Sequence, residues 1–128
     1  MCITPSCRYV EETTKLLNIE KVGHVQRPAL GPGGLEGDDK LLKHDDSAIY
    51  RTCVGKLLYL AGYRFDVQWS IRGLCQRLKD PTGYDMRKLR HVTKYLMSTR
   101  ELALFFPARG HEIKEVIVSC DADWAGLE

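Results

Sequence analysis

The amino-acid sequence predicts an α+β chain, in which a bundle of three helices is followed by a β-hairpin that begins a larger sheet. Between residues 47 and 98, apolar side chains recur at the three- and four-residue spacing of helices that pack on a core. After Arg100 the period changes, and residues 102–106 and 115–120 have the composition of strands on either side of a Pro/Gly turn. The pattern therefore divides the chain into residues 1–46, 47–100 and 101–128.

The first segment, residues 1–46, combines a short helix with a polar linker. Residues 9–19 carry Val10, Thr13, Leu16 and Leu17 at helical spacing. Residues 31–37 are rich in glycine and are followed by two aspartates, which is typical of a linker. These glycines are not followed by the Gly-Lys-Ser/Thr of a phosphate-binding loop, which argues against a nucleotide site there.

The second segment, residues 47–100, begins with a helix that is apolar over about half of its circumference. Asp45, Asp46 and Ser47 offer capping groups at its start, and the pattern continues to about Ala61. Because the apolar arc is so wide, we expect the helix to be buried against two neighbours. Gly55 lies within it, and since glycine costs about 1 kcal/mol relative to alanine in a helix, we expect close packing at that position.

The next helix is predicted to begin at Asp66, which can cap it, and to run to about Lys79 before Pro81 ends it. Its apolar residues form a narrow stripe. Trp69 lies off that stripe, so it serves either to pack against another element or to offer a ring for base stacking.

The third helix is predicted to follow a capping box formed by Thr82 and Asp85, and to end near Ser98. Its outer side carries only basic residues beyond the first turn: Arg87, Arg90, His91 and Lys94. Residues 50–110 hold 12 Lys and Arg against 4 Asp and Glu, although the net charge of the chain is +2. Two interpretations stay open for this face, a surface that binds phosphates and an ordinary solvated one.

Two carboxylates near the end of the chain suggest a metal site. Asp121 and Asp123 follow the β-branched run at residues 116–118. Side chains two residues apart in a strand point to the same face, so the two carboxylates could converge on one ion. Both carboxylates are therefore candidate ligands.

The cysteines and the N-terminus bear on the environment of the chain. The five cysteines are odd in number and form no Cys-x-x-Cys pair, which favours reduced, structural thiols. No apolar run approaches the roughly 20 residues of a membrane helix, and the first residues do not resemble a signal peptide. We therefore expect an intracellular chain with no membrane partner.

Four motifs follow one another along the chain: YRTCVGKLLYLA at residues 50–61, RFDV at 64–67, HVTKYL at 91–96 and SCDADWAG at 119–126. Their order resembles the Pol polyprotein of copia-type retrotransposons, where reverse transcriptase joins ribonuclease H. The family has Tyr-Arg-x-x-Val-Gly-x-Leu-x-Tyr-Leu, then Arg-Pro-Asp-Ile, two further helices and Ser-Asp-Ala-Asp-Trp-Ala-Gly. Phe65 stands where the family has proline. The likeness covers residues 48–126 and extends more weakly to residues 9–28.

The resemblance implies roles for each part of the chain. The helices would correspond to the thumb and connection region, which holds the template–primer duplex, and the hairpin to the start of the ribonuclease H sheet. Asp121 would match the first metal-binding carboxylate of ribonuclease H, which uses Mg²⁺ in the intact family enzyme. Two-metal chemistry needs several oxygen ligands, so this chain alone is expected to bind no metal cofactor.

The function expected from these observations is that of a Pol polyprotein fragment without catalysis of its own. The Asp-Asp pairs at residues 38–39 and 45–46 lack the flanking strand of a polymerase site, and the further ribonuclease carboxylates would lie beyond residue 128. Expected partners are an RNA–DNA or DNA duplex and the rest of the polyprotein, with self-association through an unpaired hairpin. The alternatives are a small helical protein-interaction module, or a remnant without function.

Overall fold

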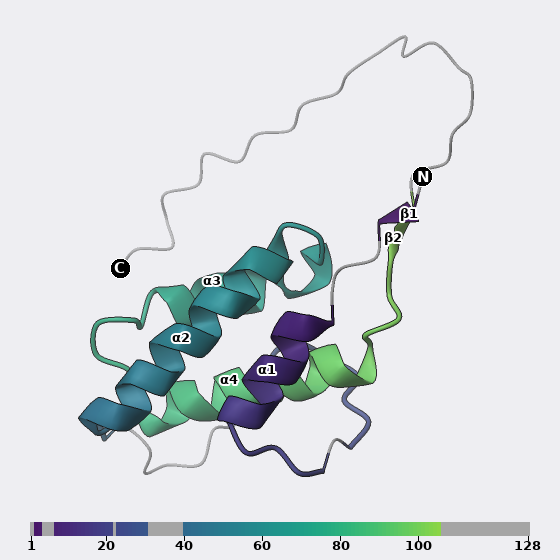
Figure 1. The fold of residues 1–128 in the computed structure, drawn as a ribbon. Coiled ribbons are helices and arrows are strands. Elements are labelled where there is room, and N and C mark those ends of the chain that lie inside the picture. Colours follow the sequence, from purple (N-terminus) through teal and green to yellow (C-terminus); the bar gives the residue numbers. More distant parts are fainter. Residues whose placement is uncertain (1, 4–6, 22, 31–39, 106–128) are drawn as a thin grey trace, which may run out of the picture.

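The fold is a bundle of four helices, seen in a computed structural model that describes residues 2–3, 7–21, 23–30 and 40–105. The helices are α1 (Arg8–Leu16), α2 (His44–Ala61), α3 (Phe65–Cys75) and α4 (Gly83–Ser98). Helices α2 and α4 each contact the other three, whereas α1 and α3 each pack on both α2 and α4 (Figure 1). None of the described helices combines the length and apolar character needed to cross a membrane.

The core of the bundle draws on all four helices. Its buried apolar residues are Val10, Leu17, Tyr50, Cys53, Val54, Leu57, Leu60, Ala61, Val67, Ile71, Leu74, Leu89, Val92, Tyr95 and Leu96. The largest share comes from α2, whose wide apolar arc is buried against α1, α3 and α4, as the sequence predicted. Burial raises the pKa of the Cys53 thiol to about 11, so this cysteine behaves as a small apolar side chain.

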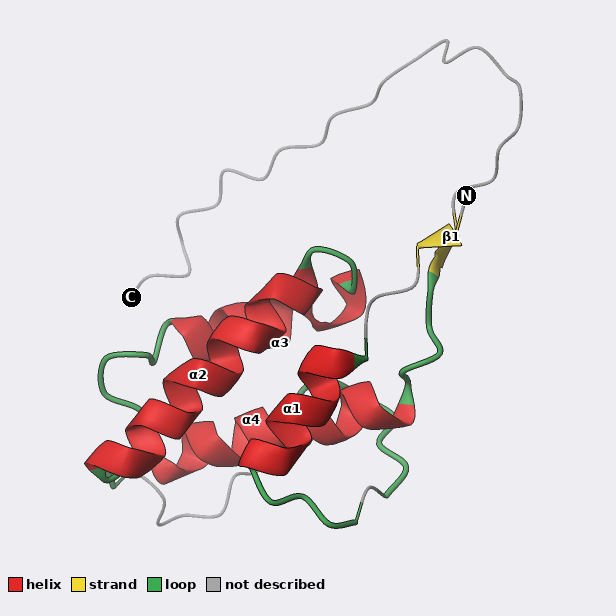
Figure 2. Ribbon diagram, in the orientation of Figure 1, coloured by secondary structure: helices red, strands yellow, loops and turns green. Residues whose placement is uncertain are grey.

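The predicted α+β fold with a β-hairpin is wrong for the part of the chain that the structure describes. Strand pairing there consists of a single bridge and a two-residue ladder, in which β1 (Cys2–Ile3) runs antiparallel to β2 (Leu104–Phe105). Figure 2 shows this ladder outside the red helices. The predicted strand at 102–106 thus pairs with the N-terminal segment, because α1 and α4 bring residues 3 and 104 together. The segment at 115–120 lies outside the described residues.

The start of α2 and the surroundings of Gly55 differ from the prediction. The residue before α2 is Lys43, whose side chain makes no capping bond, so Asp45 and Asp46 lie in the first helical turn and favour it through the helix dipole. Gly55 is exposed, and an added Cβ would meet no atom within 4 Å, so the expected close packing is absent. The side chains of Asp45 and Asp46, and the backbone of Gly55, all face solvent.

Helix α3 ends at Cys75, a turn before the predicted Lys79. The guanidinium of Arg51 donates to the carbonyl oxygens of Leu78 and Lys79 at 2.8 and 3.1 Å. Beyond these residues, the Pro81 carbonyl accepts from the backbone of Leu42 at 2.9 Å. These bonds from α2 and the preceding loop take up carbonyl groups that would otherwise have no partner after the helix ends.

A buried arginine joins the start of α3 to the end of α4. Arg64 is 5% exposed and donates to both carboxylate oxygens of Asp66, at 2.9 and 2.6 Å. It also donates to the carbonyl and the hydroxyl of Thr99, at 3.0 and 2.8 Å. The Tyr95 hydroxyl donates to Asp66 at 2.8 Å. Every charge in this cluster therefore has partners, which is the condition for burying an ion pair without a large penalty.

We predict that acid weakens the fold. Hydrogen bonds from Lys56 and Arg8 lower the pKa of Glu12 from 4.5 to about 2, and the bonds from Arg64 lower the pKa of Asp66. A depressed folded-state pKa contributes stability above the unfolded value, and this is lost as pH falls towards the folded value. Urea unfolding should show stability falling between about pH 4.5 and 2. Lys56→Met brings the folded-state pKa of Glu12 closer to its unfolded value, so stability should fall less over this range. Unchanged stability of the parent chain over this range would contradict the assignment.

We also predict that Phe65→Pro preserves or raises stability. Phe65 is the first residue of α3 and is 60% exposed, so its N–H has no place in the helical ladder and its ring contributes little burial. Arg64 before it lies outside the α region, with φ −121° and ψ 81°, and proline disfavours the α region for the residue that precedes it. The free energy of unfolding should rise by up to about 1 kcal/mol. The control, Arg72→Pro inside α3, should cost about 3 kcal/mol or more; a loss of stability in Phe65→Pro would refute the prediction.

Candidate nucleic-acid interface

The interface is built on α4, whose start is fixed by the predicted capping box. The Thr82 hydroxyl accepts from the Asp85 backbone at 3.4 Å, and an Asp85 oxygen accepts from the Thr82 backbone at 3.0 Å. Burial raises the pKa of Asp85, but hydrogen bonds from Thr82 and Arg77 outweigh it, so the pKa is lowered overall. The single acid of α4 is thus buried and ionised inside the cap, and leaves the outer face to cations.

The four predicted phosphate-binding residues lie along one face of α4. Relative to Arg87, the other three are three, four and seven residues further on, which is the spacing of a single helical face. Arg90 is exposed, and the remaining members, Arg87, His91 and Lys94, are half-buried. Among the described residues, neither Arg90 nor Lys94 forms a salt bridge. Both cations are therefore available to an anion from outside.

The loop after α1 lies against this face. His91 Nε2 lies 2.9 Å from the carbonyl oxygen of Arg27, and the Ser98 hydroxyl donates to the carbonyl of Val25 at 3.3 Å. His91 therefore has a partner within the chain, which limits its part in any phosphate contact. The same contact brings the exposed Arg27 beside α4. Arg27 was not predicted as a site residue, because nothing in the sequence indicates where the loop passes.

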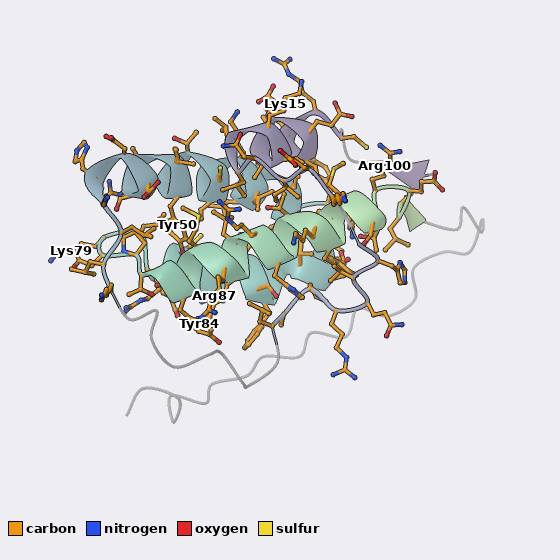
Figure 3. The ribbon with its side chains drawn as sticks, turned by 90° about the horizontal axis from the view of Figure 1, so that it is seen from below. Lys15, Tyr50, Lys79, Tyr84, Arg87 and Arg100 are labelled. Carbon is orange, nitrogen blue, oxygen red and sulfur yellow. The ribbon has the colours of Figure 1, made fainter. Side chains whose placement is uncertain are left out.

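Tyr84 and Lys88 are a second addition to the predicted set. The Lys88 ammonium lies 4.2 Å from the centre of the Tyr84 ring, and the Arg87 guanidinium lies 5.7 Å from it. Figure 3 shows Arg87 and Tyr84 next to each other near the start of α4, with Lys15 of α1 on the opposite side of the molecule. Both distances are within cation–π range. The signal in the sequence was the spacing of three and four residues from Tyr84 to the two cations.

The two predictions that concern Trp69 and the metal site have different outcomes. Trp69 is 77% exposed, so its ring is not packed into the described bundle and is accessible for stacking. Asp121 and Asp123 lie outside the described residues, and their metal site stays a prediction. In the part of the chain that is described, no group of three or more His, Cys, Asp or Glu could hold a metal ion.

The electrostatic balance of the helical region favours an anionic partner. Residues 64–100 contain nine Lys and Arg against three Asp. Asp66 and Asp85 are held in the salt bridges described above. The third acid, Asp80, is exposed and belongs to neither of these salt bridges. An excess of cations whose neighbouring acids are already paired produces a positive surface potential.

Comparison with known proteins identifies relatives of this chain in Arabidopsis thaliana. An uncharacterized mitochondrial protein is 34% identical over 86 residues, which are 66% of this chain and 34% of that protein. The retrovirus-related Pol polyproteins from transposons RE1 and RE2 are 34% and 36% identical over 84 residues, 66% of this chain and 6% of each polyprotein. The chain thus spans a third or less of each relative. No family model and no solved structure matches it.

Two of these relatives are retrovirus-related Pol polyproteins. The chain is a homologue of these retrotransposon Pol polyproteins over a short segment of them. The resemblance drawn from the motifs is thereby confirmed at the level of the Pol polyprotein.

Proposed function

We propose that this chain is a segment of a copia-type Pol polyprotein, from the region between reverse transcriptase and ribonuclease H, that binds nucleic-acid duplex through the basic face of α4. The partners are an RNA–DNA or DNA duplex and the remainder of the polyprotein. The observation that carries the proposal is that α4 presents Arg87, Arg90 and Lys94 on one side while its only acid is buried in the cap.

The geometry of this face suits a phosphate backbone. Successive turns of a helix place cations about 5.4 Å apart along the axis, close enough for neighbouring residues to reach successive phosphates of one strand. Arginine and lysine contacts with phosphate position a protein on duplex without reading its sequence. Binding through these three side chains is therefore expected to be strongly dependent on salt and tolerant of sequence.

Catalysis by the chain alone is not part of the proposal. Asp45 and Asp46 lie in the exposed first turn of α2, where they cannot form the strand-borne carboxylate pair of a polymerase. Mg²⁺ chemistry would use carboxylates supplied together with Asp121 and Asp123 by the intact polyprotein. The chain is therefore proposed to hold duplex for an active site elsewhere in the polyprotein.

We predict that the purified chain binds a labelled RNA–DNA hybrid without added metal, and that affinity falls steeply as salt rises. Each phosphate contact contributes about 0.9 to the magnitude of the slope of log K against log salt. The triple variant Arg87→Glu, Arg90→Glu and Lys94→Glu should lose binding at moderate salt. Fluorescence anisotropy over a salt series measures both quantities.

The matched control changes the same amount of charge on other parts of the surface. Lys15, Lys21 and Lys43 are exposed and lie outside α4, so their replacement by Glu lowers the net charge equally. This control should retain most of the affinity of the parent chain and a similar slope. Equal losses in the two triple variants would show that total charge, and not the α4 face, governs binding. Circular dichroism confirms that both variants remain helical.

A second candidate function is a helical interaction module, and the exposed side of α2 favours it. Leu58 and Tyr59 are 54% and 60% exposed beside the open position of Gly55. A protein partner or a second copy of the chain could cover this apolar side. Leu58→Lys would then reduce self-association in sedimentation and leave hybrid binding unchanged, whereas the α4 charge reversals would have the opposite pattern.

A further inference from the structure

A cavity of about 370 Å³ lies between α3, α4 and the loop that follows α1. It is lined by Pro28, Ala29, Leu30, Trp69, Ser70, Gly73, Tyr84, Lys88 and Val92. The volume is at the lower end of the range for small-molecule sites, and suits one planar ring system with an attached sugar. Its walls come from three separate parts of the chain, so the folded bundle is needed to form it.

Two aromatic residues stand at this cavity, one on each helix. Trp69 of α3 is 77% exposed, so its indole faces are not covered by the chain. Tyr84 of α4 is half-buried, and the Lys88 ammonium lies 4.2 Å from its ring centre. An uncovered indole beside an apolar hollow has the properties of a stacking surface, because each base stacked on such a ring contributes to affinity regardless of its identity.

The charge around the cavity favours a ligand that carries phosphate. Lys88 is the charged side chain among the described lining residues, and none of these residues carries a carboxylate. Asp85 lies 3.5 Å from Lys88, but the same carboxylate also accepts hydrogen bonds from Thr82 and Arg77, so Lys88 is one of several partners. An apolar hollow with a cationic rim binds an aromatic ring linked to an anion.

The cavity adjoins the basic face of α4. The ring of Tyr84, which lines the cavity, has its centre 5.7 Å from the Arg87 guanidinium, and Pro28 on the opposite wall follows Arg27, whose carbonyl contacts His91. A strand whose phosphates run along Arg87, Arg90 and Lys94 would therefore pass the mouth of the cavity. Bases within a duplex are already stacked and paired, so the occupant must be a base without a partner.

We propose that this cavity holds one unpaired nucleobase of a nucleic-acid strand, stacked on Trp69, while the adjoining phosphates contact Lys88 and the basic face of α4. This inference rests on the proposed function, since it adds a base site to the phosphate surface. The lining offers few hydrogen-bonding groups, the Ser70 hydroxyl and the Lys88 ammonium among them, so the site accepts bases with little sequence preference. The ligand class is a duplex with an unpaired end.

Gly73 provides the decisive variant. It lines the cavity, and an added Cβ would meet no atom within 4 Å, so the side chain of Gly73→Leu starts in open space at the cavity. Leucine is also a better helix former than glycine, so α3 should be retained. Gly55→Leu on α2 is the matched control, because its Cβ likewise meets nothing within 4 Å and lies outside the cavity lining.

The experiment compares three versions of one labelled hybrid: blunt, with a single unpaired thymidine at one end, and with an abasic residue at the same end. We expect the unpaired base to bind about tenfold more tightly than the abasic end, as stacking on one aromatic ring implies. Gly73→Leu should abolish this difference, and Gly55→Leu should keep it. In a Trp124→Phe background, which leaves Trp69 as the only tryptophan, the unpaired base should quench the fluorescence of Trp69.

The outcomes separate this inference from the proposed function. Equal affinities for unpaired and abasic ends in the parent chain would overturn the base site, while salt-dependent binding of the blunt hybrid would leave the proposed function standing. Quenching of Trp69 by a short single strand, without binding of blunt hybrid, would support the base site and refute the duplex surface. If Gly73→Leu changes only sedimentation, the hollow is a contact between copies of the chain and the proposal is wrong.

Discussion

The buried guanidinium of Arg64 is the constraint on which the geometry of α3 and α4 depends. It binds Asp66 at the start of α3 and Thr99 just after the end of α4, so one side chain ties together two elements that lie 33 residues apart. Tyr95 closes the cluster through its own bond to Asp66. Because the charges and polar groups are all paired, the cluster fixes one relative position of the helices and disfavours sliding between them.

The other end of the same helix pair is held by a different set of polar contacts. The Asp85 carboxylate accepts from Thr82 within the cap and from Arg77 in the turn after α3, while Arg51 of α2 binds the carbonyls of Leu78 and Lys79. With both ends held, the groove between α3 and α4 has fixed walls. The exposed Trp69 and the basic side of α4 therefore keep their relative positions, as a preorganised binding surface requires.

Sequence patterns predicted the helices well and the strands poorly. The helical periodicity and the Thr82–Asp85 cap are local features, and each was found where predicted. The end of α3 was misjudged because Arg51, 27 residues before Leu78, binds the carbonyls of Leu78 and Lys79 in the turn that replaces the last predicted helical turn, and no local pattern indicates that contact. Strand pairing is non-local, and no pattern in residues 102–106 identifies Cys2–Ile3 as the partner. In the candidate site, the basic face of α4 was predicted from the spacing of Arg87, Arg90 and Lys94. The place of Arg27 beside α4 depends on the path of the loop after α1 and was not predicted.

The motif residues that revealed the Pol resemblance serve the fold and not the proposed chemistry. Tyr50 is fully buried and donates to the carbonyl of Leu74 at 2.9 Å, Arg51 binds the turn after α3, and the buried Arg64 forms an ion pair with Asp66. Similarity at these motif positions therefore reports mainly on the packing of the bundle. It says less about the proposed binding, which depends largely on Arg87, Arg90 and the ring of Trp69 outside the quoted motifs. Because a substitution of the α4 cations would leave these packing residues intact, the proposed binding must be tested at α4 and the adjoining cavity, and not inferred from the motifs.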